Sequence, residues 1–131
     1  MPSETETQLI SLCQQVLDSI HGQDWDAYTQ LCDPSLSAFE PEGRGHLIEG
    51  MPFHRFYFEM EASGRPAQST ISSPKVQLLG DDVAVVTYVR LTQRIEADGS
   101  APTSVAEETR VWQKQSGQWR HVHFHRSIPG A

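Results

Sequence analysis

The residues with the most obvious chemical potential lie near the C-terminus, in the segment WRHVHFHRS at 119–127. His121, His123 and His125 alternate there, and on a β-strand such alternation places all three side chains on one face. Histidines two apart on a strand can bind zinc, act as bases or form a polar surface. Which of these applies depends on the residues that neighbouring strands bring close to them.

A zinc site at these histidines needs a third or fourth ligand. Glu107 is the best local candidate, because a three-residue QSG loop would place it opposite His125. The two cysteines, Cys13 and Cys32, lie far away in stretches with a helical pattern, and no H-E-x-x-H or C-x-x-C motif accompanies the histidines. We therefore predict no metal site and no cofactor, and we interpret all three histidines as the outer, half-polar face of a strand.

Arginines fall on the opposite face of the same strand. Arg126 alternates with Val122 and Phe124, which favour the core. If the QSG loop has three residues, Arg110 lies opposite Val122 and Glu108 lies opposite Phe124. Arg110 and Arg126 then point inward together, whereas a two-residue loop would separate them.

A third arginine, Arg90, shares a strand face with Tyr88 and is also predicted to point inward. Buried arginines are costly unless a negative group lies among them. Two explanations remain open. Glu108, helped by Glu40 or Glu107, neutralises the arginines in an ion-pair network, or the arginines line a pocket for a small anion, above all a carboxylate held by guanidinium forks.

The elements that position these residues begin with three helices. An S-x-x-E capping box at 3–6 starts the first, which ends at Gly22. A second short helix follows Asp24 and stops before Pro34, and a third begins at Pro52. Apolar residues at three- and four-residue spacing predict core or interface packing for one face of the first and third helices: Leu9, Cys13, Val16, Leu17 and Ile20, then Phe53, Phe56, Tyr57 and Met60.

After about residue 67 the pattern becomes alternating. We predict four strands at about 68–78, 82–95, 104–115 and 118–127, separated by the turn sequences GDD, EADGSAP and QSG. Helices followed by hairpin-connected strands predict a single α+β domain over 1–131, with the N-terminal helices packed on the concave face of a curved antiparallel sheet. Such an arrangement leaves a pocket between helices and sheet.

The composition restricts the possible partners. The formal net charge of −7 disfavours nucleic acid and anionic membranes. No apolar run approaches the roughly 20 residues that a bilayer crossing needs. The polar, acidic N-terminus is not a secretory signal. We therefore predict a cytoplasmic protein with reduced cysteines and with neither nucleic acid nor membrane among its partners.

Three segments in combination resemble one known family: FHRFYFE at 53–59, EETRVW at 107–112 and VHFHRS at 122–127. Together they make the chain, over about 8–127, similar to the association (hub) domain of calcium/calmodulin-dependent protein kinase II. The resemblance implies a nuclear-transport-factor-like cone. It also implies self-assembly into two stacked rings, most often dodecameric or tetradecameric, and related hub-domain proteins as possible co-assembly partners.

The resemblance further implies an arginine-lined pocket that takes small carboxylates. The matching positions are Arg90, Arg110 and Arg126, with His54 near the entrance, and Tyr28 is a further candidate for a pocket hydroxyl. The three arginines are those that strand alternation turns inward.

Two local features depart from this family. The segment MEASGRPAQ at 60–68 is shorter than its usual counterpart and lacks the tryptophan common there, and His121 stands where the family tends to have an aliphatic residue. The sequence shows no kinase domain, so we expect a stand-alone homologue of the hub.

The leading prediction is a non-enzymatic, homo-oligomeric ring protein with an anion pocket. The alternative is an isomerase- or cyclase-like enzyme that uses Tyr28, His54 or Tyr88 in acid–base chemistry within the cone. An arginine-rich pocket suits anion binding better, because nearby cations lower the pKa of a carboxylate base. A third possibility is a modulator that co-assembles with related hubs.

Overall fold

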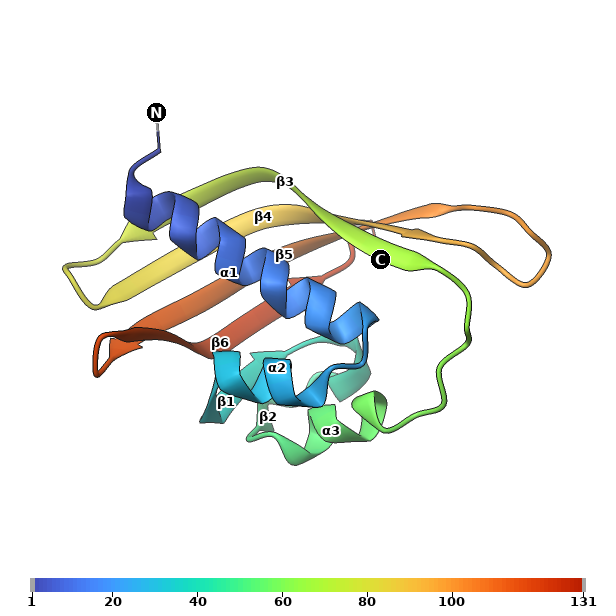
Figure 1. Cartoon of the computed structure of the whole chain (residues 1–131), viewed down its shortest axis with the longest axis horizontal. Coiled ribbons are helices and arrows are strands. Elements are labelled where there is room, and N and C mark those ends of the chain that lie inside the picture. Colours follow the sequence, from blue (N-terminus) through green and yellow to red (C-terminus); the bar gives the residue numbers. More distant parts are fainter. Residues whose placement is uncertain (1, 131) are drawn as a thin grey trace.

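The computed structural model describes residues 2–130 as an α+β domain (Figure 1). In chain order the elements are α1 (Glu4–His21), α2 (Trp25–Leu31), β1 (Cys32–Phe39), the 3-10 helix η1 (Pro41–Gly43), β2 (Ile48–Glu49), α3 (Pro52–Phe58), β3 (Ala67–Leu78), β4 (Val83–Arg94), β5 (Thr103–Gln115) and β6 (Gln118–Ser127). The α+β prediction is confirmed, and the four predicted strands correspond to β3–β6 with ends shifted by one residue at most.

One curved sheet contains all six strands, in the order β2-β1-β6-β5-β4-β3. The strand pairs are antiparallel except β1–β6, which is parallel, so the expectation of a wholly antiparallel sheet needs this one correction. The reason is that β1 returns from the helical layer and joins the sheet beside the last strand of the chain. Figure 1 shows α1 lying across the sheet, and a long arch connecting α3 to β3.

Local capping explains where the first two helices begin. Ser3 Oγ accepts a hydrogen bond from the Glu6 N–H at 3.1 Å, and the Ser3 N–H donates to the Glu6 carboxylate at 3.2 Å, which is the predicted capping box. Asp24 accepts from the Ala27 N–H at the start of α2. The second helix ends earlier than predicted, and Cys32 is the first residue of β1 rather than a helical residue.

The third helix starts at Pro52 as predicted, but its apolar face is not part of the core. Phe56 is 65% exposed and Met60 is 52% exposed, whereas the buried residue of α3 is His54. Phe53 packs only at the edge of the core. Of the two predicted alternatives, core packing does not hold for most of this face, because so short a helix at the border of the fold buries only the side that carries His54; interface packing stays a prediction.

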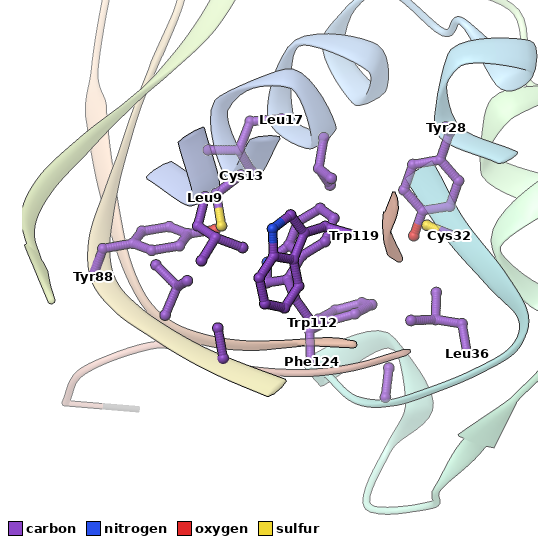
Figure 2. Packing of buried hydrophobic residues seen from close by; sticks show 14 of the residues in the cluster. Leu9, Cys13, Leu17, Tyr28, Cys32, Leu36, Tyr88, Trp112, Trp119 and Phe124 are labelled. Carbon is purple, nitrogen blue, oxygen red and sulfur yellow. The ribbon is translucent and has the colours of Figure 1, made fainter. Parts of the chain in front are cut away.

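The core lies between α1 and the sheet (Figure 2). The α1 stripe buries Leu9, Cys13, Val16 and Leu17 completely, and Trp112 of β5 is the largest fully buried side chain. Burial of these apolar side chains holds α1 against the strands that carry the arginines. None of the described helices has the length and apolar composition that a bilayer crossing requires.

The β5–β6 turn differs from the prediction. Gln115 pairs with Gln118, so the loop has two residues, and Ser116 and Gly117 both have positive φ, at 50° and 81°. Two central residues with positive φ are typical of a tight hairpin turn whose twist matches the strands. By itself this loop would have moved the inward arginines apart.

A β-bulge restores their alignment. Val111 pairs with His123 and Trp112 pairs with His121, which leaves Val122 as an extra, half-buried residue in β6. Beyond Val122 along β6, side chains therefore point to the predicted faces of the sheet. Each of these residues nevertheless lies opposite a different residue of β5 from the one expected.

The resulting register brings the charged residues together. Arg110 pairs with Phe124, and Glu108 pairs with Arg126, in place of the predicted Val122 and Phe124. Both arginines do share the inner face, but the bulge rather than a three-residue loop places them there.

The bulge also separates the three histidines. His121 is fully buried and points inward with Trp112, so its predicted place on the outer face is wrong. His123 is half-buried and His125 exposed on the outer side. Glu107 lies opposite Ser127 rather than His125.

Candidate functional site

A cavity of about 570 Å³ opens between the sheet and the α3 side of the molecule. All five residues predicted for a pocket line it: Tyr28, His54, Arg90, Arg110 and Arg126. Its volume is in the range of small-molecule sites. The fold thus gathers at one place residues from α2, α3 and three different strands.

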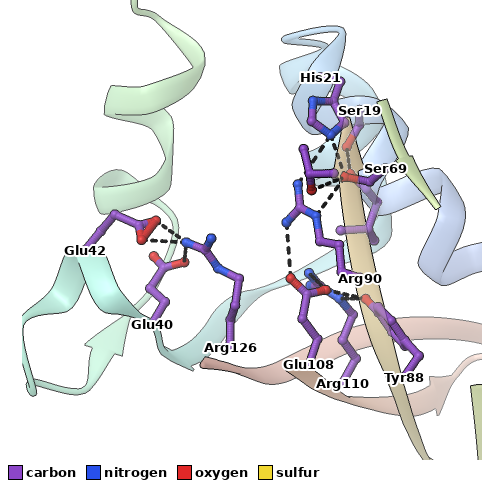
Figure 3. A network of polar contacts seen from close by, with 12 residues as sticks. Ser19, His21, Glu40, Glu42, Ser69, Tyr88, Arg90, Glu108, Arg110 and Arg126 are labelled. Atoms are coloured by element: carbon purple, nitrogen blue, oxygen red, sulfur yellow. Dashed lines mark hydrogen bonds and ion pairs between the residues drawn. The ribbon is translucent and has the colours of Figure 1, made fainter. Parts of the chain in front are cut away.

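Glu108 is the centre of the deepest charged network (Figure 3). One of its oxygens accepts from Arg90 Nη1 and the other from Arg110 Nη2, both at 3.1 Å. The Tyr88 hydroxyl donates to Glu108 at 2.5 Å and accepts from Arg110 Nε at 2.7 Å. The ion-pair explanation for Arg90 and Arg110 is therefore correct in this structure, with Glu108 as their counter-ion, while Glu107 is exposed and takes no part.

The protonation of Glu108 follows from this network. Burial by itself raises the pKa of a carboxyl group, but Arg110, Arg90 and the hydrogen bond from Tyr88 outweigh it and lower the pKa of Glu108 to about 2. Burial raises the pKa of the Tyr88 hydroxyl, which stays protonated. The deep network is thus a fixed set of charges with no group ready to exchange a proton near neutral pH.

Arg90 extends the network toward the end of α1. Its Nε donates to Ser69 Oγ at 2.8 Å, and its Nη2 lies 3.4 Å from His21 Nε2, which also contacts Ser69 Oγ at 2.7 Å. Burial, then the positive charges of Arg90 and Arg94, lower the pKa of His21. A neutral His21 can therefore accept a hydrogen bond from Arg90 or Ser69.

Arg126 lies apart from Arg90, on the side of Glu40 and Glu42 (Figure 3). It is less enclosed than Arg90, with a side chain 22% exposed. Its Nη2 donates to both oxygens of Glu42 and lies 3.8 Å from Glu40. Within residues 2–130, its Nε and Nη1 make no hydrogen bond. Arg126 therefore keeps donors that can form a fork with a ligand.

His54 and Tyr28 form the adjacent wall. His54 Nε2 lies 3.3 Å from a Glu40 oxygen, without the alignment of a hydrogen bond, and both side chains are 7% exposed. Tyr28 is buried with its ring 6.1 Å from that of His54 and 4.7 Å from that of Phe58. These rings form a mainly aromatic wall of the cavity.

The buried His121 supports the site from behind. Its Nε2 lies 3.3 Å from Arg110 Nη1, its Nδ1 lies 3.5 Å from Cys32 Sγ, and its ring stacks on Phe124. Burial and the charge of Arg110 lower the pKa of His121, so the ring is neutral and accepts from the arginine. This role was missed, because only the bulge turns His121 inward.

Further lining residues were also missed by the sequence analysis, among them His21, Glu42, Arg65 and Arg94. Arg94 could have been found from the sequence, since it is four residues beyond Arg90 on the same strand face.

Among residues 2–130, no group of three or more His, Cys, Asp or Glu side chains is arranged to hold a metal ion.

The sequence model of the family described as "Calcium/calmodulin dependent protein kinase II association domain" matches residues 5–130. The chain is 48% identical to the rabbit (Oryctolagus cuniculus) calcium/calmodulin-dependent protein kinase type II subunit delta over 122 residues, covering 92% of this chain. It spans 23% of that relative's length.

Solved structures of two related domains have the same fold. The hub homology domain from Chlamydomonas reinhardtii superposes with a TM-score of 0.90 at 42% identity, covering 95% of this chain and 98% of the other. The association domain of the C. elegans kinase also gives 0.90, at 43% identity, with 95% of each chain covered. A nuclear transport factor 2-like protein from Salmonella, at 22% identity over 96% of this chain and 92% of its own, gives 0.77 and shows the fold alone.

Proposed function

Because this chain belongs to the calcium/calmodulin-dependent protein kinase II association-domain family, we propose that it is a non-catalytic subunit that assembles with copies of itself into a ring, dodecameric or tetradecameric. The observation that carries the proposal is the family match over residues 5–130. Related hub-domain proteins are the proposed co-assembly partners, and the cytoplasm is the proposed location.

The outer face of the sheet supports self-association. Along β4, the residues that alternate with the buried set are only half-buried and mostly apolar, and they include Val85, Val89 and Leu91. Val85 pairs with Val111 of β5, so the apolar surface continues across two strands. Contiguous exposed apolar surface marks a contact site, and a second copy of the chain is the occupant that the family match favours.

The cavity is the second part of the proposal, as a site for a small carboxylate. All three side-chain nitrogens of Arg90 and of Arg110 already have partners, whereas Arg126 is paired through Nη2 alone, so Arg126 is the arginine best able to bind the ligand, through Nε and Nη1. Arg90 and Arg110 then provide positive potential, and His54 and Tyr28 form the wall of the site. A cavity crowded with cations disfavours a general base, which supports a binding rather than a catalytic role.

Native mass spectrometry of the intact chain over a range of concentrations tests the assembly. We expect a discrete species of dodecameric or tetradecameric mass. Val85→Glu places a charge in the apolar outer face and should yield smaller species that keep the wild-type circular dichroism spectrum. Gln15→Glu adds the same charge at an exposed position of α1 and should assemble as wild type. A wild-type chain that stays monomeric or dimeric at all concentrations would overturn the proposal.

A further inference from the structure

The cavity has positive charge at more than one place. Five arginines and three glutamates line it, and Glu108 pairs with two of these arginines, in a protein whose formal net charge is −7. We propose that it binds an elongated dicarboxylate, with one carboxylate at Arg126 and the other at a rim formed by Arg94 and Arg65. This inference rests on the proposed carboxylate site and specifies the ligand class that the site accepts.

The rim is a second cationic centre, separate from the deep network. Arg94 is the last residue of β4, and Arg65 lies on the arch between α3 and β3; both are exposed side chains that line the cavity. No described residue forms a hydrogen bond or salt bridge with either guanidinium group. The deep arginines, by contrast, already have Glu108.

The two centres are well separated along the sheet. Arg126 pairs with Glu108, which pairs with Tyr88, and Arg94 is six residues beyond Tyr88 on the same strand. With a rise of about 3.3 Å per residue and about 4.8 Å between strands, the Cα atoms of Arg126 and Arg94 are roughly 20 Å apart. Only a long ligand, with both side chains reaching toward it, can contact both guanidinium groups.

The cavity wall on the α3 side suits an apolar spacer, because Tyr57, Phe58 and Met60 line it there. On the sheet side, Phe124 lies beyond Arg126 and not between the two centres. Gln23 Nε2 donates to the Met60 carbonyl at 2.6 Å, which fixes this wall to the end of α1. The cavity of about 570 Å³ would hold roughly 20 water molecules at about 30 Å³ each, several times the space of a small monocarboxylate.

The negative groups at the cavity leave the rim available. Glu40 and Glu42 lie beside Arg126 and His54, at the far end from Arg94. Glu61, on the arch, is the third glutamate that lines the cavity, and it forms no salt bridge within residues 2–130. A second ligand carboxylate at the rim therefore meets two unpaired arginines and one glutamate.

Isothermal titration of the full chain tests this with adipate, suberate and sebacate against hexanoate, octanoate and decanoate, at constant ionic strength. We expect sebacate to bind on the order of tenfold more tightly than decanoate, and adipate to show no such gain over hexanoate. Arg94→Gln should remove most of the sebacate gain and leave decanoate binding unchanged. Arg44→Gln, an exposed arginine outside the cavity, is the matched control and should change neither.

The outcomes separate this inference from the carboxylate site itself. If decanoate binds, Arg126→Gln abolishes that binding, and sebacate binds no better than decanoate, the carboxylate site stands and the dicarboxylate inference is wrong. If Arg94→Gln weakens both ligands equally, the rim acts only through general charge, and the inference is also wrong. If none of the six acids binds, both proposals fail.

Discussion

Replacing Glu108 with glutamine should destabilise the protein strongly, although the change removes no bulk. Glu108 is 2% exposed and is the counter-ion of two arginines that are themselves buried. Glutamine resembles the protonated acid, so the variant retains the shape of the side chain and loses its charge. Arg90 and Arg110 would then remain in the core without a compensating negative group.

The size of the effect follows from the pKa of the carboxyl group. Its fall from 4.5 to about 2 means that the charged form is favoured in the folded state by about 3 kcal/mol, at about 1.4 kcal/mol per pKa unit. Breaking a buried ion pair by removing one partner costs a similar ~3–5 kcal/mol. Since whole domains are stable by only ~5–15 kcal/mol, we expect Glu108→Gln to remove a large part of the stability.

Urea denaturation followed by tryptophan fluorescence, at a fixed protein concentration, measures the change. Glu107→Gln is the matched control, because Glu107 is adjacent but exposed on the other face of β5 and should change stability by less than about 0.5 kcal/mol. Because the pKa of Glu108 is lowered on folding, its contribution is complete above about pH 4.5 and is lost as the pH falls toward 2, and the variant should lack this loss. A Glu108→Gln variant destabilised by less than about 1 kcal/mol would refute the reasoning.

Two further predictions concern His121 and Glu42. Burial and the charge of Arg110 hold the pKa of His121 well below 6.5 in the folded protein, so as the pH drops below 6.5 this histidine is protonated in the unfolded chain first and the stability of the fold decreases. Denaturation at several pH values should show a smaller decrease for His121→Gln than for the wild type. An equal decrease in the two proteins would contradict this prediction. Glu42→Gln removes a carboxylate that occupies Arg126 and should tighten decanoate binding several-fold in the same titration, whereas weaker binding would show that Glu42 assists the ligand.

Most of the fold could be predicted from the sequence because its signals are local. The capping box at the start of α1, Asp24 before α2 and Pro52 at the start of α3 act within one helical turn. Strand alternation and turn residues similarly define β3–β6. The parallel pairing of β1 with β6 joins residues 32–39 to the other end of the chain, and no local pattern encodes it.

The site could be predicted less completely, because strand alternation assigns a side chain to a face of the sheet only where the strand register is known. Arg90, Arg110 and Arg126 were assigned to the inner face and do line the cavity. His121 was assigned to the outer face, since an extra residue at Val122 cannot be inferred from alternation alone. The two errors at the hairpin, in the loop length and in the missing bulge, compensated each other only for residues beyond Val122.

The arginines of the cavity divide into those that maintain the fold and those that remain available to a ligand. Arg90 and Arg110 donate to Glu108, Tyr88 and Ser69, so replacing either one leaves buried partners without hydrogen bonds and changes stability before it changes binding.

Arg126 is held only by Glu42 and Glu40 near the surface, and Arg94 makes no side-chain ion pair with any residue from 2 to 130. Their replacement should alter ligand affinity with little effect on folding. A comparison of the four arginines by denaturation and by titration therefore distinguishes a working pocket from a structural ion network: in a purely structural network, no single arginine affects binding without also affecting stability.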